Sequence, residues 1–219
     1  MLVAQNNLAT TYSVLGRLEE TLRIRQDVYS GYVKLLGEEH EGTVHTAFNY
    51  ATALLDLQRF DEGKSLLRKV IPVARRVLGE YYDTTLRMRM NYAGVLAKLN
   101  RFEEAKAVLR KTMPVARRVL GDKDRLMLKM RWQYASTLYN DNGATLDDLR
   151  EAVTTLEDAV RTAQRVFGGV HPLTNAIDFW LRNAQAALAD VVAGKPAQSF
   201  PTVLSLLDTT RGTPSPGST

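Results

Sequence analysis

Pro72-Val-Ala-Arg-Arg-Val-Leu-Gly79 returns 42 residues later as Pro114-Val-Ala-Arg-Arg-Val-Leu-Gly121. Leu-Gly pairs at 36–37, 78–79 and 120–121 keep the same spacing, and Phe167-Gly168 continues the series after five inserted residues. A second series lies earlier in each unit: Asn7-Leu8-Ala9, Asn49-Tyr50-Ala51, Asn91-Tyr92-Ala93 and Gln133-Tyr134-Ala135. Several independent positions agree on one spacing, which establishes an internal repeat of the length that solenoids use.

Each repeat predicts two helices. Tyr50, Ala51, Leu54 and Leu57 form an apolar stripe of helical period, and after a turn a second stripe begins at Phe60. Stacked helix pairs bury their apolar faces only against their neighbours, so we expect an all-α fold, an α-solenoid of stacked antiparallel helix pairs. The expected helices span residues 1–14, 18–36, 43–57, 60–78, 85–99, 102–120, 127–140, 147–167 and 173–193.

The repeats predict one array over residues 1–193, with about four helix pairs and a final helix, and a tail over 194–219. In the tail we expect a short capping segment followed by a disordered end rich in Pro, Gly, Ser and Thr. The insertion between 141 and 146 has the composition of a loop and lengthens one turn. Pro72 and Pro114 fall inside second helices. We expect each proline to kink its helix or to interrupt the hydrogen bonding of the helix.

The composition excludes several classes of protein. Of the 219 residues, 45% are hydrophobic and 24% are charged, so the chain can bury a core and wholesale disorder is excluded. The lack of cysteine excludes disulfides, a thiol nucleophile and thiolate metal sites. No signal peptide, lipidation motif or membrane-spanning stretch is recognised, so we expect a cytoplasmic protein. The net charge of +5 raises nucleic acid or an anionic membrane as a partner.

The spacing inside the unit separates the solenoid families that share this period. Tyr50, Ala51, Leu54, Phe60 and Gly63 occupy the alternating large and small positions of the tetratricopeptide pattern, and the next unit repeats them. The chain therefore resembles a tetratricopeptide repeat protein over residues 1–192. This resemblance implies a superhelix in which the first helices of successive units line a concave groove.

The links between units narrow the resemblance to the tetratricopeptide repeats of kinesin light chains. Two links read Leu36-Gly37-Glu-Glu-His40-Glu-Gly-Thr43 and Phe167-Gly168-Gly-Val-His171-Pro172-Leu-Thr174, and one turn reads Leu99-Asn-Arg101-Phe102-Glu-Glu-Ala105. Tyr82 and Asp124 replace the histidine in the two other links. The resemblance implies a non-catalytic scaffold for protein–protein interaction, of the cargo- or adaptor-binding kind, with no cofactor.

Two columns of polar side chains are expected to face the groove. They are His45, Arg87 and Lys129, and, one helical turn further along the same face, Asn7, Asn49, Asn91 and Gln133. Each amide can donate to and accept from a peptide backbone, and the cations favour carboxylates or phosphates. As the resemblance also implies, we expect these residues to bind an extended, acidic peptide.

Each set of candidate residues has a structural alternative. The amides can instead cap or bridge adjacent helices, although four amides in register at an exposed face are not needed for packing. Phe48, Met90 and Trp132 flank the columns. Side chains of these types at helical spacing more often belong to a core, which is the interpretation that we favour for them.

The sequence contains no recognisable motif for catalysis or for cofactor or metal binding, so we expect a protein that is not an enzyme. The three histidines do not cluster at ligand spacing. Acidic pairs such as Asp61-Glu62 open second helices, where negative charge complements the helix dipole. A structural role therefore accounts for these carboxylates.

Two other functions stay open as alternatives. RNA or another polyanion could bind the basic outer faces of the second helices, although arginines such as Arg75-Arg76 are not interleaved with stacking aromatics, which disfavours nucleic acid. The chain could also be an architectural repeat segment of a larger signalling protein. In addition, the first helix has no capping neighbour, which makes it a candidate surface for self-association.

Overall fold

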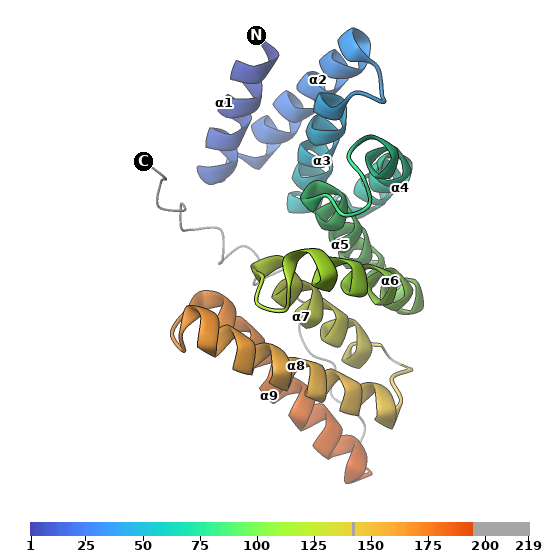
Figure 1. Cartoon of the computed structure of the whole chain (residues 1–219), viewed down its shortest axis with the longest axis vertical. Coiled ribbons are helices and arrows are strands. Elements are labelled where there is room, and N and C mark those ends of the chain that lie inside the picture. The colour runs from blue at the N-terminus through green and yellow to red at the C-terminus, as the bar shows by residue number, and fades with distance from the viewer. Residues whose placement is uncertain (142, 195–219) are drawn as a thin grey trace. The chain divides into compact units, whose positions relative to one another are not determined.

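The computed structural model describes residues 1–141 and 143–194 (Figure 1). The predicted capping segment and disordered end lie outside the described residues. Within the described part of the chain all regular structure is helical, as the sequence predicts. The helices are α1 (Leu2–Val14), α2 (Leu18–Leu36), α3 (Glu41–Asp56), α4 (Phe60–Val77), α5 (Asp83–Lys98), α6 (Phe102–Leu120), α7 (Arg125–Tyr139), α8 (Leu146–Phe167) and α9 (Pro172–Val192).

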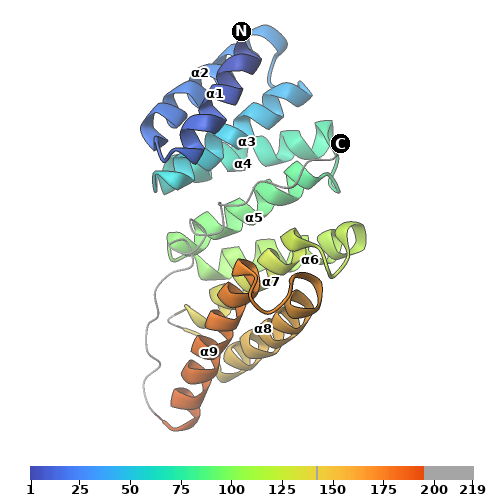
Figure 2. The ribbon, with the colours of Figure 1, turned by 90° about the vertical axis from the view of Figure 1, so that its left-hand side faces the viewer.

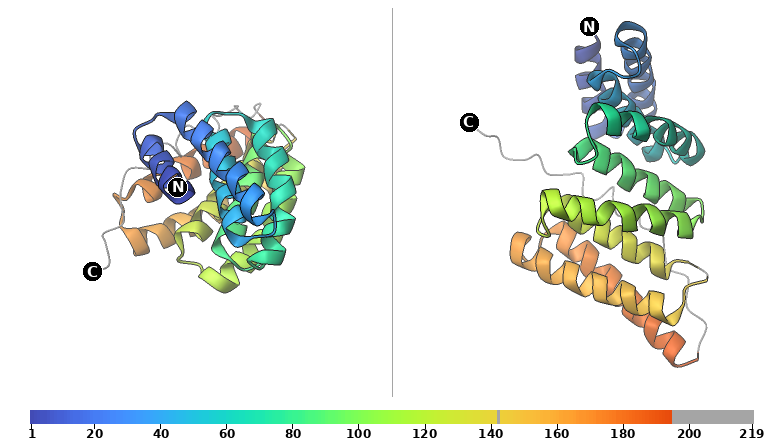
Figure 3. Two further views of the ribbon diagram at one scale, coloured as in Figure 1. Left: turned by 90° about the horizontal axis from the view of Figure 1, so that it is seen from above. Right: turned by 45° about the vertical axis from the view of Figure 1, so that its right-hand side comes forward.

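The chain forms two compact units that divide inside α6. The first unit runs from Met1 to Ala116, and the second begins at Arg117. In the first unit each helix from α1 to α5 packs on the next, and α3 also contacts α5. In the second unit α7 packs on α8, α8 packs on α9, and α7 also contacts α9. Within each unit successive helices run back and forth, as Figure 3 shows, so the predicted antiparallel pairs are confirmed.

Three first helices, α3, α5 and α7, begin two residues earlier than the spacing predicts, and for two of them a link residue caps the helix. His40 precedes α3, and its Nδ1 accepts a hydrogen bond from the backbone N–H of Gly42 at 3.0 Å. Asp124 accepts from the N–H of Leu126 at 2.7 Å before α7. His171 caps α9 in the same way as His40. The link histidines thus supply N-caps, which satisfy backbone donors that a helix start leaves open.

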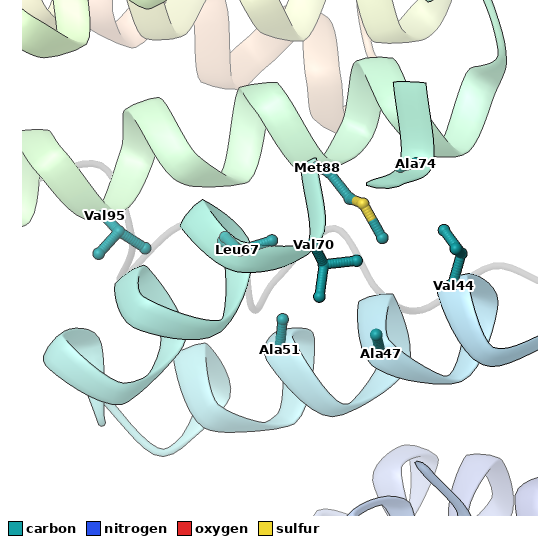
Figure 4. Close-up of a cluster of buried hydrophobic side chains, with 8 residues drawn as sticks. All are labelled: Val44, Ala47, Ala51, Leu67, Val70, Ala74, Met88 and Val95. Atoms are coloured by element: carbon teal, nitrogen blue, oxygen red, sulfur yellow. The ribbon is translucent and has the colours of Figure 1, made fainter. Parts of the chain in front are cut away.

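The core of the first unit lies between α3, α4 and α5 (Figure 4). Its buried members are Val44, Ala47, Ala51, Leu67, Val70, Ala74, Met88 and Val95. Alanines on α3 let α4 approach closely, and the bulkier side chains fill the space around them. Gly63 serves the same close approach, because an added Cβ would lie 2.5 Å from Cδ2 of Leu55.

The exposed side of the second helices carries the two internal prolines. Pro72 and Pro114 lie within α4 and α6, and both helices continue through them. Both prolines are exposed. The backbone carbonyl that loses its partner at each proline therefore lies on the side where water can replace the missing N–H.

Candidate functional site

Four of the predicted groove residues come together on two neighbouring helices of the first unit. His45 and Asn49 lie one turn apart on α3, and Arg87 and Asn91 lie one turn apart on α5. The two helices contact each other, and Figure 2 shows α1, α3 and α5 following one another in the first unit. Arg87 is exposed and the other three side chains are half-buried. We call these four residues the α3–α5 stripe.

Arg87 and His45 each have an acidic neighbour one turn earlier in the same helix. Nε of Arg87 donates to Oδ2 of Asp83 at 2.5 Å. Nε2 of His45 lies 3.7 Å from Oε1 of Glu41, and its Nδ1 lies 3.3 Å from Oγ1 of Thr84. The Arg87–Asp83 pair is about half exposed, and pairs of this kind contribute about 1 kcal/mol or less. An anionic ligand can therefore compete for Arg87.

The amides of the stripe are used differently. Nδ2 of Asn49 donates to Oδ1 of Asn6 at 3.2 Å, so this amide bridges α3 and α1. Asn7, which the repeat spacing aligns with Asn49, is exposed. Asn6 lies one residue away, and a shift of one residue turns a side chain by about 100° around a helix. Asn49 thus bridges adjacent helices, as the structural alternative for the amides describes. Its partner is Asn6, and not Asn7, which the repeat spacing singled out.

Asn91 lies between two cations on one side of α5. Its side chain forms no hydrogen bond with the described residues and is half-buried. Arg87 precedes it by four residues and Lys98 follows it by seven, intervals that return to one side of a helix. The two cations stand about 6 Å and about 10 Å from Asn91 along the helix axis.

Lys98 was not among the residues that the spacing singled out. It is half-buried, and burial lowers the pKa of its ammonium group. No carboxylate among the described residues pairs with it. One signal in the sequence marks the position, because Lys98 stands where the preceding repeat has Asp56. An unpaired, partly desolvated ammonium group favours an incoming anion.

The remaining predicted groove residues belong to the second unit. Lys129 and Gln133 lie four residues apart on α7, and both are half-buried. Between them Trp132 is only 1% exposed, with its ring 6.4 Å from that of Trp180 on α9. The core interpretation of Trp132 is therefore confirmed. Phe48 is half-buried and packs against the core of the first unit.

The basic outer face of α4 is partly neutralised. Nζ of Lys69 lies 2.6 Å from Oε1 of Glu38, and Nη2 of Arg76 lies 2.6 Å from Oε1 of Glu39. Arg68 and Arg75 are exposed. The acidic residues that open the second helices are also paired, as in the 2.6 Å contact between Arg59 and Glu62. Much of the surface charge is therefore matched locally.

The described residues contain no group of three or more His, Cys, Asp or Glu side chains that could hold a metal ion. Among the same residues, no helix combines the length and the apolar character that a bilayer crossing needs. The polar chemistry described here is thus limited to amides, cations and their local carboxylate partners.

The tetratricopeptide repeat model matches residues 1–62 and 44–118, which together span more than half of the chain. No curated protein matches the sequence. Solved structures with a similar fold include a putative kinesin light chain from Podosopora anserina with nearly identical TPR-like repeats. It is 21% identical, with a TM-score of 0.72, over 96% of this chain and 93% of that chain.

A second crystal structure, of a substituted form of that protein, gives a TM-score of 0.73 at 21% identity, over 96% of this chain and 92% of that chain. BtubC (BKLC) from P. vanneervenii is 14% identical, with a TM-score of 0.63, over 97% of this chain and 82% of that chain. The predicted tetratricopeptide solenoid is confirmed, and its fold is similar to that of the kinesin light chain-like repeats in these structures.

Proposed function

This chain belongs to the tetratricopeptide repeat family, and on that premise we propose that it is a non-catalytic scaffold that binds an extended, acidic peptide along the α3–α5 stripe. Stacked helical repeats create extended concave surfaces that such proteins use for binding. A cargo or adaptor protein, of the kind that the kinesin light chain resemblance implies, would present such a peptide.

The observation that carries this proposal is the unpaired amide of Asn91 between Arg87 and Lys98. An amide that is half-exposed can donate to a peptide carbonyl and accept from a peptide N–H, which fixes the register of an extended chain. The two cations add a preference for carboxylates on the same peptide. Asn49 keeps its Oδ1 as an acceptor, because its hydrogen bond to Asn6 uses Nδ2.

Charge reversal on the stripe should abolish most of the binding. We expect Arg87→Glu to lower the affinity for a fluorescein-labelled, Glu-rich decapeptide about tenfold, because a favourable contact becomes a repulsive one. This change corresponds to about 1.4 kcal/mol of binding free energy. Fluorescence anisotropy at low and high salt measures the dissociation constant. An Asn91→Ala variant should also lower the affinity for the peptide, since it removes the contact of the amide with the peptide backbone. It leaves the charge of the protein unchanged.

The matched control for Arg87→Glu is Arg68→Glu, which makes the same change of charge on the exposed face of α4. We expect this control to alter the peptide affinity less than twofold. Equal losses in both variants would mean that net charge, not the stripe, governs binding. Unchanged affinity in Arg87→Glu and Asn91→Ala would contradict the proposed site.

Removal of the local acid should have the opposite effect. Asp83 forms an ion pair with Arg87 in the free protein. We therefore expect Asp83→Asn to raise the affinity for the same peptide about threefold, because the guanidinium group no longer has this partner. The anisotropy titration described above measures it, with circular dichroism as a check that α5 stays folded. A weaker complex in Asp83→Asn would exclude Arg87 as the anion contact.

RNA binding through the basic outer face is tested in the same assay. A labelled single-stranded RNA should show weak binding that falls steeply with salt if it contacts the outer arginines. In that case Arg68→Glu should lower the affinity for RNA, while Arg87→Glu should leave the affinity for RNA unchanged. The reverse pattern, with RNA lost in Arg87→Glu, would place a polyanion in the stripe instead of a peptide.

A further inference from the structure

Three polar residues of α5 lie on one line that runs along the helix. Arg87, Asn91 and Lys98 are separated by four and seven residues, so they lie within about 40° of one another around the helix axis. Arg87 and Lys98 stand about 16 Å apart along that axis, with Asn91 between them. We call these three residues the α5 line. A ligand that contacts all three must therefore extend along α5.

The neighbouring helix α3 does not repeat this arrangement. Its equivalent positions hold His45, Asn49 and Asp56. Nδ2 of Asn49 already donates to Oδ1 of Asn6 on α1. The carboxylate of Asp56 repels an acidic ligand at the end where α5 has Lys98. Of the two helices, α5 is thus the one with a cation at both ends of the line.

Both cations of the α5 line can accept an incoming anion. Arg87 is about half exposed, and an exposed ion pair such as the one that it forms with Asp83 contributes little stability. Lys98 is half-buried, and no carboxylate among the described residues pairs with it. Water and salt screen a partly buried charge less than an exposed one. A ligand with one carboxylate near each end of the line therefore gains two charge-assisted contacts.

We propose that the α5 line recognises an extended peptide segment with two acidic side chains four or six positions apart. This inference rests on the proposed function, because it takes the ligand of the stripe to be an acidic peptide. An extended chain advances about 3.3 Å per residue, so the distance of about 16 Å between the cations corresponds to about five residues.

The alternation of side chains narrows this spacing. Successive side chains of an extended chain point to opposite sides, so two acidic residues five positions apart do not both face α5. Spacings of four and six positions place both carboxylates on one side, about 13 Å and about 20 Å apart. The long side chains of Arg87 and Lys98 cover the remaining difference of about 3 Å.

Asn91 sets the register of the same segment. It stands about 6 Å from Arg87 and about 10 Å from Lys98 along the helix axis, which corresponds to about two and about three residues of an extended chain. In the complex its amide lies opposite the peptide backbone between the two acidic residues, where it donates to a carbonyl and accepts from an N–H. This contact needs no particular side chain, so the intervening residues of the peptide can vary.

Fluorescence anisotropy of the full chain with four peptides of one composition tests the spacing. Each is a fluorescein-labelled dodecapeptide of Ser, Thr and Gln with two Glu residues, which are one, four, five or six positions apart. We expect the peptides with spacings of four and six to bind about fivefold more tightly than the other two, because these reach both cations from one side. Equal affinity of all four, or binding of the Glu-rich decapeptide alone, overturns this inference and leaves the proposed function standing. No binding of any of the five peptides overturns both.

Removal of one cation should abolish the preference for spacing. In Lys98→Gln we expect the four peptides to bind with affinities within about twofold of one another, because a single cation does not distinguish them. The matched control is Lys111→Gln, which makes the same change of charge at an exposed position of α6 and should keep the preference. A preference that survives in Lys98→Gln, or that is lost in Lys111→Gln, overturns the role of the α5 line.

An exchange of charges between chain and peptide separates this contact from a general attraction. Lys98→Glu should bind the peptide with a spacing of four poorly, and replacement of one of the two peptide Glu residues by Lys should restore the affinity. The exchanged peptide has no net charge, so net attraction cannot explain the restoration. The order that restores it, Glu before Lys or Lys before Glu, gives the direction of the peptide along α5. Restoration by neither order overturns the contact between Lys98 and an acidic residue.

Discussion

Replacement of Trp132 by alanine is expected to lower the free energy of unfolding by about 4 kcal/mol, within the range of about 3–5 kcal/mol for large aromatic side chains in a core. The indole is 1% exposed and lies beside Trp180, whose ring is 5.6 Å from that of Tyr139. Its removal leaves a cavity between α7 and α9 that rigid neighbouring rings cannot fill. The melting temperature should fall by about 10 °C.

The remaining tryptophan reports on this change directly. The chain has two tryptophans, so in Trp132→Ala the fluorescence of Trp180 alone follows urea unfolding in the second unit. Trp132→Phe is the matched control. The indole Nε1 finds no acceptor among the described residues, so phenylalanine retains most of the packing and loses no hydrogen bond. A loss below about 1 kcal/mol in Trp132→Ala, outside the range for core positions, would place this side chain outside the core.

The second large effect is expected in the first unit, where Leu67→Ala should destabilise by about 3–4 kcal/mol. Leu67 is fully buried and packs with Ala51 and Met88 in the core formed by α3, α4 and α5. The cost combines the lost transfer of its apolar side chain from water with the cavity that alanine leaves. Urea titration followed by far-ultraviolet circular dichroism gives the free energy of unfolding.

Leu35→Ala makes the same chemical change where the side chain is 73% exposed. We expect it to alter the free energy of unfolding by less than about 0.5 kcal/mol, as is usual for surface positions. Similar losses at residues 35 and 67 would mean that leucine content, not burial, sets stability. Neither variant touches the α3–α5 stripe, so peptide binding by the folded fraction should be unchanged in both.

The fold could be predicted almost completely, because the repeat supplies the same information several times. All nine predicted helices are present in the described residues, and their ends agree within two residues. The expected starts of α3, α5 and α7 lie two residues late, since the repeat pattern marks one link position, held by Thr43, Thr85 and Met127, and not the residue that precedes the helix. Hydrophobic spacing identifies helices well, whereas a helix start depends on a local side-chain contact.

The candidate site could be predicted only in part. Spacing put His45, Asn49, Arg87 and Asn91 on one pair of contacting helices, which the structure reproduces for the first unit. It could not show that Asn49 already bridges to Asn6. Spacing also predicted a core position for both Phe48 and Trp132, although Phe48 is half-buried and only Trp132 is fully in the core.

The sequence by itself determined the all-α repeat, the helix pairs and the columns of polar residues, because these follow from the period of apolar side chains along the chain. Tertiary structure alone decided which polar groups stay open. Lys98 has no carboxylate partner among the described residues and is partly desolvated, and Asn91 keeps an amide without a hydrogen bond to them. Arg87 forms an ion pair with Asp83. The physical reason is that pairing and desolvation depend on distances of a few ångströms between side chains on different turns and helices, which repeat spacing does not specify.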